Sequence, residues 1–189
     1  MNATRSIFGA LSVALMSACT IQTDPAKPLL IYTAKQAVKL SYCDDLANTA
    51  YQIAEEKRGG ATKQSLFTAI TNDSSAEIKA ALVDDIYRSD LESSWAYATN
   101  VFSECATKVA DIPSDNIEVA SLCAQKSLVA LGAGEMFQRN EAKVDAYTAF
   151  APYKSVRPFV VVDKVYEERL NSQQASDWAW DYCMSTVSD

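Results

Sequence analysis

The sequence predicts an all-α protein made of two sequence-related, disulfide-framed helical units packed as a bundle. The composition favours helices, because the 189 residues include only five glycines and five prolines and are rich in Ala, Leu, Lys, Glu and Gln. The stretch Val83–Tyr87 recurs in similar form as Val162–Tyr166. Each copy is followed by a Trp-containing run, which ends at Cys105 in the first and at Cys183 in the second.

The cysteine spacing extends this repeat toward the N-terminus. Cys43 and Cys123 precede the tyrosines of the two motifs by 44 and 43 residues. We therefore expect one unit over residues 33–113 and a second over residues 114–189. Apolar and aromatic residues make up 49% of the chain, which is enough to bury a core across both units.

The first unit is predicted to hold four helices, because its apolar residues recur at helical spacing between clear start and stop signals. The first helix is expected from Thr33 or Ser41 to Arg58, where Gly59-Gly60 ends it, and a short second helix over Thr62–Thr71. The capping box Ser74-x-x-Glu77 begins the third helix. Ser93 is the N-cap of the fourth helix, which must end before Pro113.

The second unit is predicted to repeat this order. It comprises a helix that opens at Asp115-x-x-Glu118 and runs to Arg139, a short helix over Val144–Phe150, a helix with Pro158 in its first turn, and a last helix over Ser172–Val187. Gly132 and Gly134 interrupt the first of these helices, and we expect them to allow a close helix crossing. The β-prone run Phe159–Val162 is expected to be helical, because its counterpart in the first unit favours a helix.

Four of the five cysteines are expected to form disulfides. In a bundle whose helices run up and down in turn, the start of the first helix lies beside the end of the fourth. This favours Cys43–Cys105 and Cys123–Cys183. A second possibility pairs Cys105 with Cys123 and Cys43 with Cys183, and the weaker alternative is a zinc site, which lacks both a C-x-x-C spacing and any histidine.

The N-terminus has the features of an export signal. Arg5 precedes the apolar run Ile7–Met16, which is too short to span a bilayer and is followed by the small residues Ser17 and Ala18. We therefore expect a signal peptide over residues 1–18 and a tether over residues 19–32.

The segment Leu15–Cys19 resembles the lipobox of bacterial lipoproteins, in which a peptidase cuts before a cysteine that carries diacylglycerol. The resemblance implies lipidation of Cys19. Since Thr20 rather than Asp follows, it also implies an outer-membrane lipoprotein that faces the periplasm. Removing Cys19 from the count leaves an even number of cysteines. Ordinary cleavage after Ala18 is the alternative.

Charge and composition exclude several functions. The formal net charge is −7, which argues against a nucleic-acid partner and favours faster encounter with a cationic protein. The chain contains no histidine, and therefore lacks the usual general base and the commonest transition-metal ligand. Because phosphate-binding and nucleophile motifs are also missing, we expect no cofactor, no metal and no catalytic residue.

Six residues are candidates for an interface. The duplicated pairs Asp84/Tyr87 and Asp163/Tyr166 each share one helix face, and a duplicated structural contact is the favoured interpretation over a pair of ligand or partner sites. Trp178 and Trp180 stand two apart on one helix and cannot both face the same core. We therefore expect one of them to be exposed as an anchor for a partner.

Three functions fit these observations. The first is a non-catalytic envelope lipoprotein that binds another protein, such as an inhibitor, an immunity protein or an accessory of an envelope machine. The second is a binding protein for a small ligand or a peptidoglycan fragment, which would lie between the repeats. The third is a carboxylate-dependent hydrolase, such as a glycosidase, whose acids would have to come from different helices.

Overall fold

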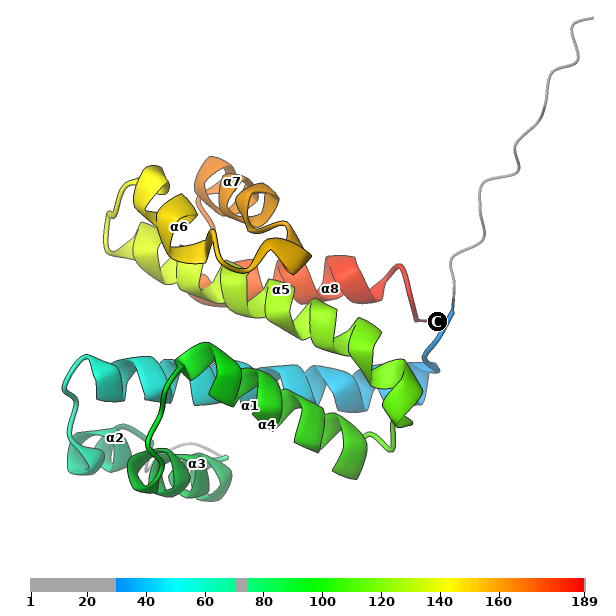
Figure 1. Ribbon diagram of the computed structural model, residues 1–189, viewed down its shortest axis with the longest axis horizontal. Coiled ribbons are helices and arrows are strands. Elements are labelled where there is room, and N and C mark those ends of the chain that lie inside the picture. The colour runs from blue at the N-terminus through cyan, green and yellow to red at the C-terminus, as the bar shows by residue number, and fades with distance from the viewer. Residues whose placement is uncertain (1–29, 71–74, 189) are drawn as a thin grey trace, which may run out of the picture.

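The computed structural model describes residues 30–70 and 75–188, and within these ranges the chain is helical with no β-strand. The described residues form eight α-helices and one short 3-10 turn (Figure 1). They are α1 (Ala34–Arg58), α2 (Lys63–Ile70), α3 (Ala76–Arg88), α4 (Ser94–Lys108), α5 (Ser114–Gln138), α6 (Lys143–Phe150), η1 (Lys154–Val156), α7 (Pro158–Glu168) and α8 (Ser172–Met184).

Side-chain caps explain several helix starts. Thr33 and Asn171 form reciprocal capping boxes at the starts of α1 and α8, and the Ser93 hydroxyl accepts a hydrogen bond from the Ala96 amide at the start of α4. The predicted capping box at Asp115 is wrong. α5 begins one residue earlier, after Pro113, and Asp115 lies in its first turn, where a carboxylate favours the helix dipole. Ser74 lies outside the described residues.

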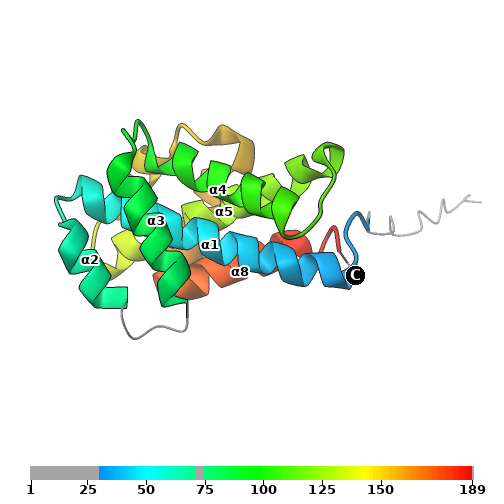
Figure 2. The ribbon, with the colours of Figure 1, turned by 90° about the horizontal axis from the view of Figure 1, so that it is seen from below.

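The two halves of the chain repeat one arrangement. α1 and α5 each have 25 residues, and α2 and α6 each have eight. α4 packs along α1 and α8 along α5, while the α2–α3 and α6–α7 pairs cover the outer sides of these long helices (Figures 1 and 2). Gly60 and Asn140, which follow α1 and α5, both adopt positive φ angles of 92° and 59°.

One disulfide closes each half. Cys43 of α1 is bonded to Cys105 of α4, and Cys123 of α5 is bonded to Cys183 of α8, so the structure has the pairing that the bundle topology favoured. Both bridges span a Cα–Cα distance of 5.5 Å and join the first half of the first helix to the latter part of the fourth.

The two halves share a hydrophobic core at the end where the chain termini meet. Phe102 of α4 packs edge-on against Trp180 of α8, with ring centroids 6.0 Å apart. Tyr32 is buried in the same core, and its hydroxyl accepts a hydrogen bond from the Ala120 amide at 3.0 Å. The tether expected through residue 32 therefore ends earlier, because Tyr32 belongs to the fold.

Gly134 allows the close crossing of α5 with the start of α8. A Cβ atom at this position would lie 2.6 Å from Cα of Ser172, which is closer than side chains approach backbone. At Gly132 a Cβ atom would lie 2.6 Å from the ring of Phe150. The prediction that these glycines serve close packing is confirmed, and the second of these contacts brings an aromatic ring over α5.

A buried polar cluster joins α1 to α5 and α8. The Ser127 hydroxyl donates to Oδ2 of Asp44 at 2.8 Å, and the Asn48 side-chain amide donates to the same oxygen at 3.1 Å and to Ser176 Oγ at 2.8 Å. Oδ1 of Asp44 is buried, and no residue in the described ranges hydrogen-bonds to it. Burial, the neighbouring Asp45 and, more weakly, Asp177 raise the pKa of Asp44 well above its usual range.

Candidate functional site: the cleft between the two halves

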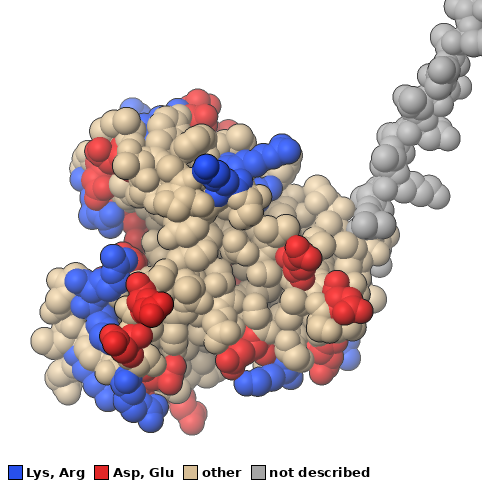
Figure 3. Space-filling model, viewed as in Figure 1, with Lys and Arg blue, Asp and Glu red and all other residues tan. Residues whose placement is uncertain are grey.

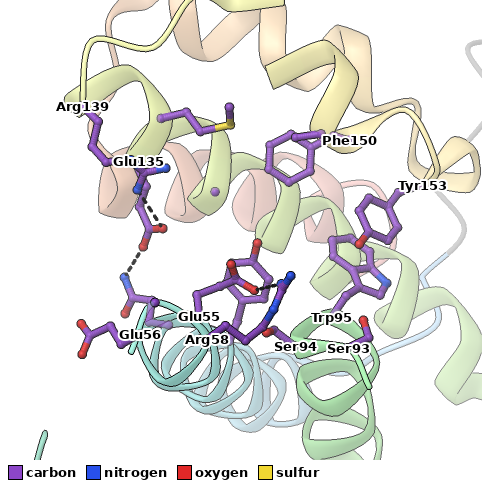
Figure 4. Close-up of a pocket in the computed structure, with 16 residues that line it drawn as sticks. Glu55, Glu56, Arg58, Ser93, Ser94, Trp95, Glu135, Arg139, Phe150 and Tyr153 are labelled. Carbon is purple, nitrogen blue, oxygen red and sulfur yellow. Dashed lines mark hydrogen bonds and ion pairs between the residues drawn. The ribbon is translucent and has the colours of Figure 1, made fainter. Parts of the chain in front are cut away.

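At the end opposite the shared core, the two halves leave an open cleft of about 990 Å³. One wall comes from the end of α1 and the start of α4, and the other from the end of α5 and the segment from α6 to Tyr153. Figure 3 shows the hollow between the halves, with acidic and basic side chains at its mouth, and Figure 4 shows its lining.

Two glutamates face the cleft from equivalent helices. Glu55 of α1 and Glu135 of α5 are separated by 80 residues, as are Cys43 and Cys123. Oε1 of Glu55 lies 2.6 Å from the Arg58 guanidinium.

Glu135 is the more buried of the two carboxylates. Its Oε1 accepts a hydrogen bond from the Gln52 amide across the cleft at 3.0 Å, and its Oε2 lies 4.0 Å from Arg139. Burial raises the pKa of Glu135, and the nearby Glu55 and Glu56 act in the same direction, although the Gln52 and Arg139 contacts oppose it.

An aromatic wall closes one side of the cleft. Trp95 at the start of α4 stacks on Tyr153, with centroids 3.8 Å apart and an angle of 17° between the rings. Phe150 lies beside Tyr153 at a centroid distance of 6.3 Å. These rings join the two halves directly and offer an apolar surface beside the charged groups (Figure 4).

Two hydroxyl groups in the cleft lack hydrogen-bond partners within the described residues. The Ser94 hydroxyl is buried and unpaired, and no described residue bonds the hydroxyl of the half-buried Tyr51. Burial, reinforced by Glu55 and Glu135, raises the pKa of Tyr51, so its hydroxyl remains a donor at physiological pH. Most buried polar groups are paired, so the enclosed Ser94 hydroxyl is an exception, whereas the Tyr51 hydroxyl is free to bond a ligand in the cleft.

The lining can bind a polar ligand by several kinds of contact at once. Three glutamates and two arginines border the cleft, leaving one excess negative charge. Hydroxyl donors, carboxylate acceptors and aromatic rings therefore converge in one place. In the described part of the chain, no cluster of three or more Cys, His, Asp or Glu side chains could hold a metal ion.

The duplicated Asp/Tyr pairs lie outside this cleft and make equivalent internal contacts. The Tyr87 hydroxyl donates to the Ala61 carbonyl just before α2, and the Tyr166 hydroxyl donates to the Glu141 carbonyl just before α6. Asp84 pairs with Lys63 at 2.5 Å.

In the second half, Asp163 pairs with Lys143 in the same way. Each pair therefore fastens the third helix of its half to the start of the second. This agrees with the structural interpretation of the repeat rather than with two binding sites.

The two tryptophans differ in burial, but neither is exposed as the sequence led us to expect. Trp180 is 5% exposed and belongs to the shared core. Trp178 is half-buried, stacks on Tyr182 and lies under Lys164 in a groove between α7 and α8. Among the aromatic side chains of the six candidate interface residues, Trp178 is the one that lines a surface groove.

Sequence reasoning missed the cleft residues Tyr51, Glu55, Ser94 and Glu135. The repeat contained a usable signal for two of them, because aligning Cys43 with Cys123 also aligns Glu55 with Glu135. No sequence pattern pointed to the hydroxyls of Tyr51 and Ser94.

Comparison with known proteins adds no family to this description, since no protein-family model, curated protein or solved structure matches the chain. Among the helices of residues 30–70 and 75–188, none has the length and apolar character needed to cross a membrane.

Proposed function

We propose that this protein is a non-catalytic lipoprotein of the cell envelope that binds another protein by taking a segment of it into the cleft between the two halves. The observation that carries the proposal is an open cleft of about 990 Å³ in which charged side chains, the Tyr51 hydroxyl and an aromatic wall lie together. A partner that supplies an acceptor to the Tyr51 hydroxyl gives this group a hydrogen bond that no described residue provides.

A basic, extended protein segment fits this lining. A backbone carbonyl of the segment accepts a hydrogen bond from Tyr51, and a Lys or Arg side chain complements the excess negative charge beside Glu135. The apolar part of the segment packs on the wall formed by Trp95 and Tyr153. The net charge of −7 also speeds the approach of a cationic partner.

The two disulfides indicate an oxidising, extracytoplasmic compartment. The lipobox-like segment before Cys19, which lies outside the described residues, supports anchoring in the outer membrane. We expect Cys19→Ser to release the protein from membranes into the soluble periplasmic fraction. Unchanged membrane partitioning of this variant would contradict the proposed lipidation.

Capture from envelope extract followed by binding measurements tests the proposed partner. Tyr51→Phe removes one hydroxyl and should weaken binding by about 0.5–1.5 kcal/mol, and Trp95→Ala should cost about 2 kcal/mol or more. Tyr42→Phe, at an exposed tyrosine outside the cleft, is the matched control. A captured protein that binds all three variants as tightly as wild type would refute binding in the cleft.

A saccharide such as a peptidoglycan fragment is the second candidate ligand. Aromatic rings beside carboxylates and unpaired hydroxyls also suit a sugar ring, which has apolar faces and hydroxyls that both donate and accept. Calorimetry with soluble peptidoglycan fragments separates the two candidates if the same Tyr51→Phe variant is used. Release of cleaved fragments, lost in Glu135→Gln, would instead reveal a carboxylate-dependent hydrolase.

A further inference from the structure

A second groove lies on the surface between α7 and α8, away from the cleft. It encloses about 660 Å³, and its lining includes Lys126, Arg157, Lys164, Trp178 and Tyr182. Figure 3 shows Lys and Arg side chains gathered where η1 leads into α7. The lining also includes Asp163 and Glu167, so its basic side chains exceed its acidic ones by one, on a protein whose formal net charge is −7.

The cations of this groove are largely uncompensated. Within the described residues, the side chains of Lys126 and Arg157 have no hydrogen bond or ion pair. Lys164 pairs with Glu168, and its ammonium also lies 5.5 Å from the centre of the Trp178 ring. Arg157 adopts a left-handed φ of 53°, which is uncommon for a residue with a side chain.

The acidic residues at the edge of the groove are already engaged elsewhere. Asp163 forms an ion pair with Lys143, and Glu167 lies 3.6 Å from the same ammonium. The groove therefore presents a net positive surface to an incoming ligand.

Exposed apolar side chains surround these cations. Val160 is 64% exposed, Tyr182 62% and Phe159 50%. Trp178 and Tyr182 stack with their centroids 6.0 Å apart. Aromatic and aliphatic side chains beside Lys and Arg are typical of surfaces that lie in the headgroup region of a bilayer.

We propose that the α7–α8 groove docks on a membrane surface that contains anionic phospholipid. In this arrangement Lys126 and Arg157 contact lipid phosphates, while Trp178 and Tyr182 enter the interface between headgroups and acyl chains. The negative charge elsewhere on the protein is repelled by the same membrane, so the groove also sets the orientation of the molecule.

The place where the chain enters the fold supports a membrane as the surface that the groove binds. This argument rests on the proposed lipidation of Cys19. The Ile31 amide donates to the Val187 carbonyl at 2.7 Å, so the chain enters the fold beside the end of α8, close to Tyr182. Leu30 follows Cys19 by eleven positions, and a fully extended chain of that length spans about 37 Å. An anchored molecule can therefore bring the groove to the bilayer.

Tryptophan fluorescence tests the docking. The mature protein purified from cells is mixed with an excess of vesicles whose lipids carry bromine on the acyl chains. One vesicle type contains phosphatidylcholine alone and the other also contains phosphatidylglycerol. We expect Trp178 to be quenched in the anionic vesicles alone and the quenching to weaken as salt rises. Trp178→Phe should remove it, because Trp180 is buried and Trp95 is stacked on Tyr153.

The decisive variant is Lys126→Gln combined with Arg157→Gln. It should lower the ratio of docked to undocked molecules roughly thirtyfold at low salt. The matched control combines Lys35→Gln with Arg88→Gln, which removes two exposed cations from the other half.

The possible outcomes distinguish docking through the groove from attachment through the lipid anchor. Quenching that is absent, equal in both vesicle types, or unchanged in the double variant would overturn docking through the groove. Binding of an acidic peptide by the groove without any response to vesicles would overturn it in favour of a protein partner. Groove-dependent quenching by a protein that carries no lipid would support the docking and refute only the lipidation.

Discussion

Replacing Asp44 with Asn tests the cost of keeping a carboxylate inside the bundle. Oδ2 of Asp44 accepts hydrogen bonds from Asn48 and Ser127, whereas Oδ1 is buried and unpaired. The substitution keeps the shape and one accepting oxygen and removes the charge. Any gain in stability that depends on pH therefore reports the buried charge itself.

The sign and size of the expected pH dependence of unfolding follow from the raised pKa of Asp44 in the folded state. At pH values between the pKa of Asp in the unfolded chain and the raised pKa in the fold, Asp44 is protonated in the folded protein and ionised in the unfolded one. The wild-type free energy of unfolding therefore falls as pH rises, by up to about 1.4 kcal/mol per pH unit, until the folded pKa is reached. Asp44→Asn lacks this loss, so its advantage over wild type should grow from pH 4 upward.

Urea unfolding at a series of pH values between about 4 and 8 measures this difference. The control is Asp115→Asn, at an exposed carboxylate in the first turn of α5. If the difference in unfolding free energy between Asp44→Asn and wild type stays constant across the series, the buried carboxylate imposes no charge cost, and our account of this cluster is wrong.

Three further perturbations have defined outcomes. Gly134→Ala should lower the free energy of unfolding by about 1–3 kcal/mol in urea, because the new methyl group meets the backbone of Ser172, although Ala usually favours a helix; a gain would contradict the close crossing. Replacing Cys43 and Cys105 together by Ala should cost about 4 kcal/mol, because the bridge spans 62 residues; a loss under 1 kcal/mol would contradict this. If a basic partner binds beside Glu135, its affinity measured by calorimetry should fall as pH is lowered toward the raised pKa of that carboxyl, and Glu135→Gln should flatten the dependence.

Local signals made much of the fold predictable. Ser93 indicated a capping position, Thr33 was one of two expected starts of the first helix, Pro158 indicated the start of α7, and the nearly equal cysteine intervals indicated a topology in which each disulfide closes one half. The same kind of signal failed at Asp115, because Pro113 already starts the helix with its fixed φ. Tyr32 was assigned to the tether because its partners, at the start of α5 and the end of the chain, are remote in sequence.

The candidate site was less predictable, because it depends on contacts between the halves. Ser94 looks like an ordinary first-turn serine, and its unpaired hydroxyl is visible only once α4 packs near α5. Trp95 could equally have been a core residue until Tyr153 was found stacked on it. Whether such residues line a cleft is decided by how α1 and α5 diverge at one end (Figure 1).

The contact between Phe102 and Trp180 has a consequence for the ancestry of the molecule. Each ring stands three residues before the second cysteine of its half, so the two positions are equivalent, and yet they touch each other. A position that meets its own counterpart is the mark of an isologous interface, the arrangement found in symmetric homodimers. The two halves thus meet as two identical subunits would, with one chain joining them.

Fusion frees such an assembly from its dependence on concentration, since the second half is always present beside the first. It also frees the two copies to diverge. Gln52 on one wall of the cleft corresponds to Gly132 on the other, 80 residues along the chain. A dimer of identical chains would have to offer the same group from both sides. The fused chain can instead present different groups to the two ends of an asymmetric ligand.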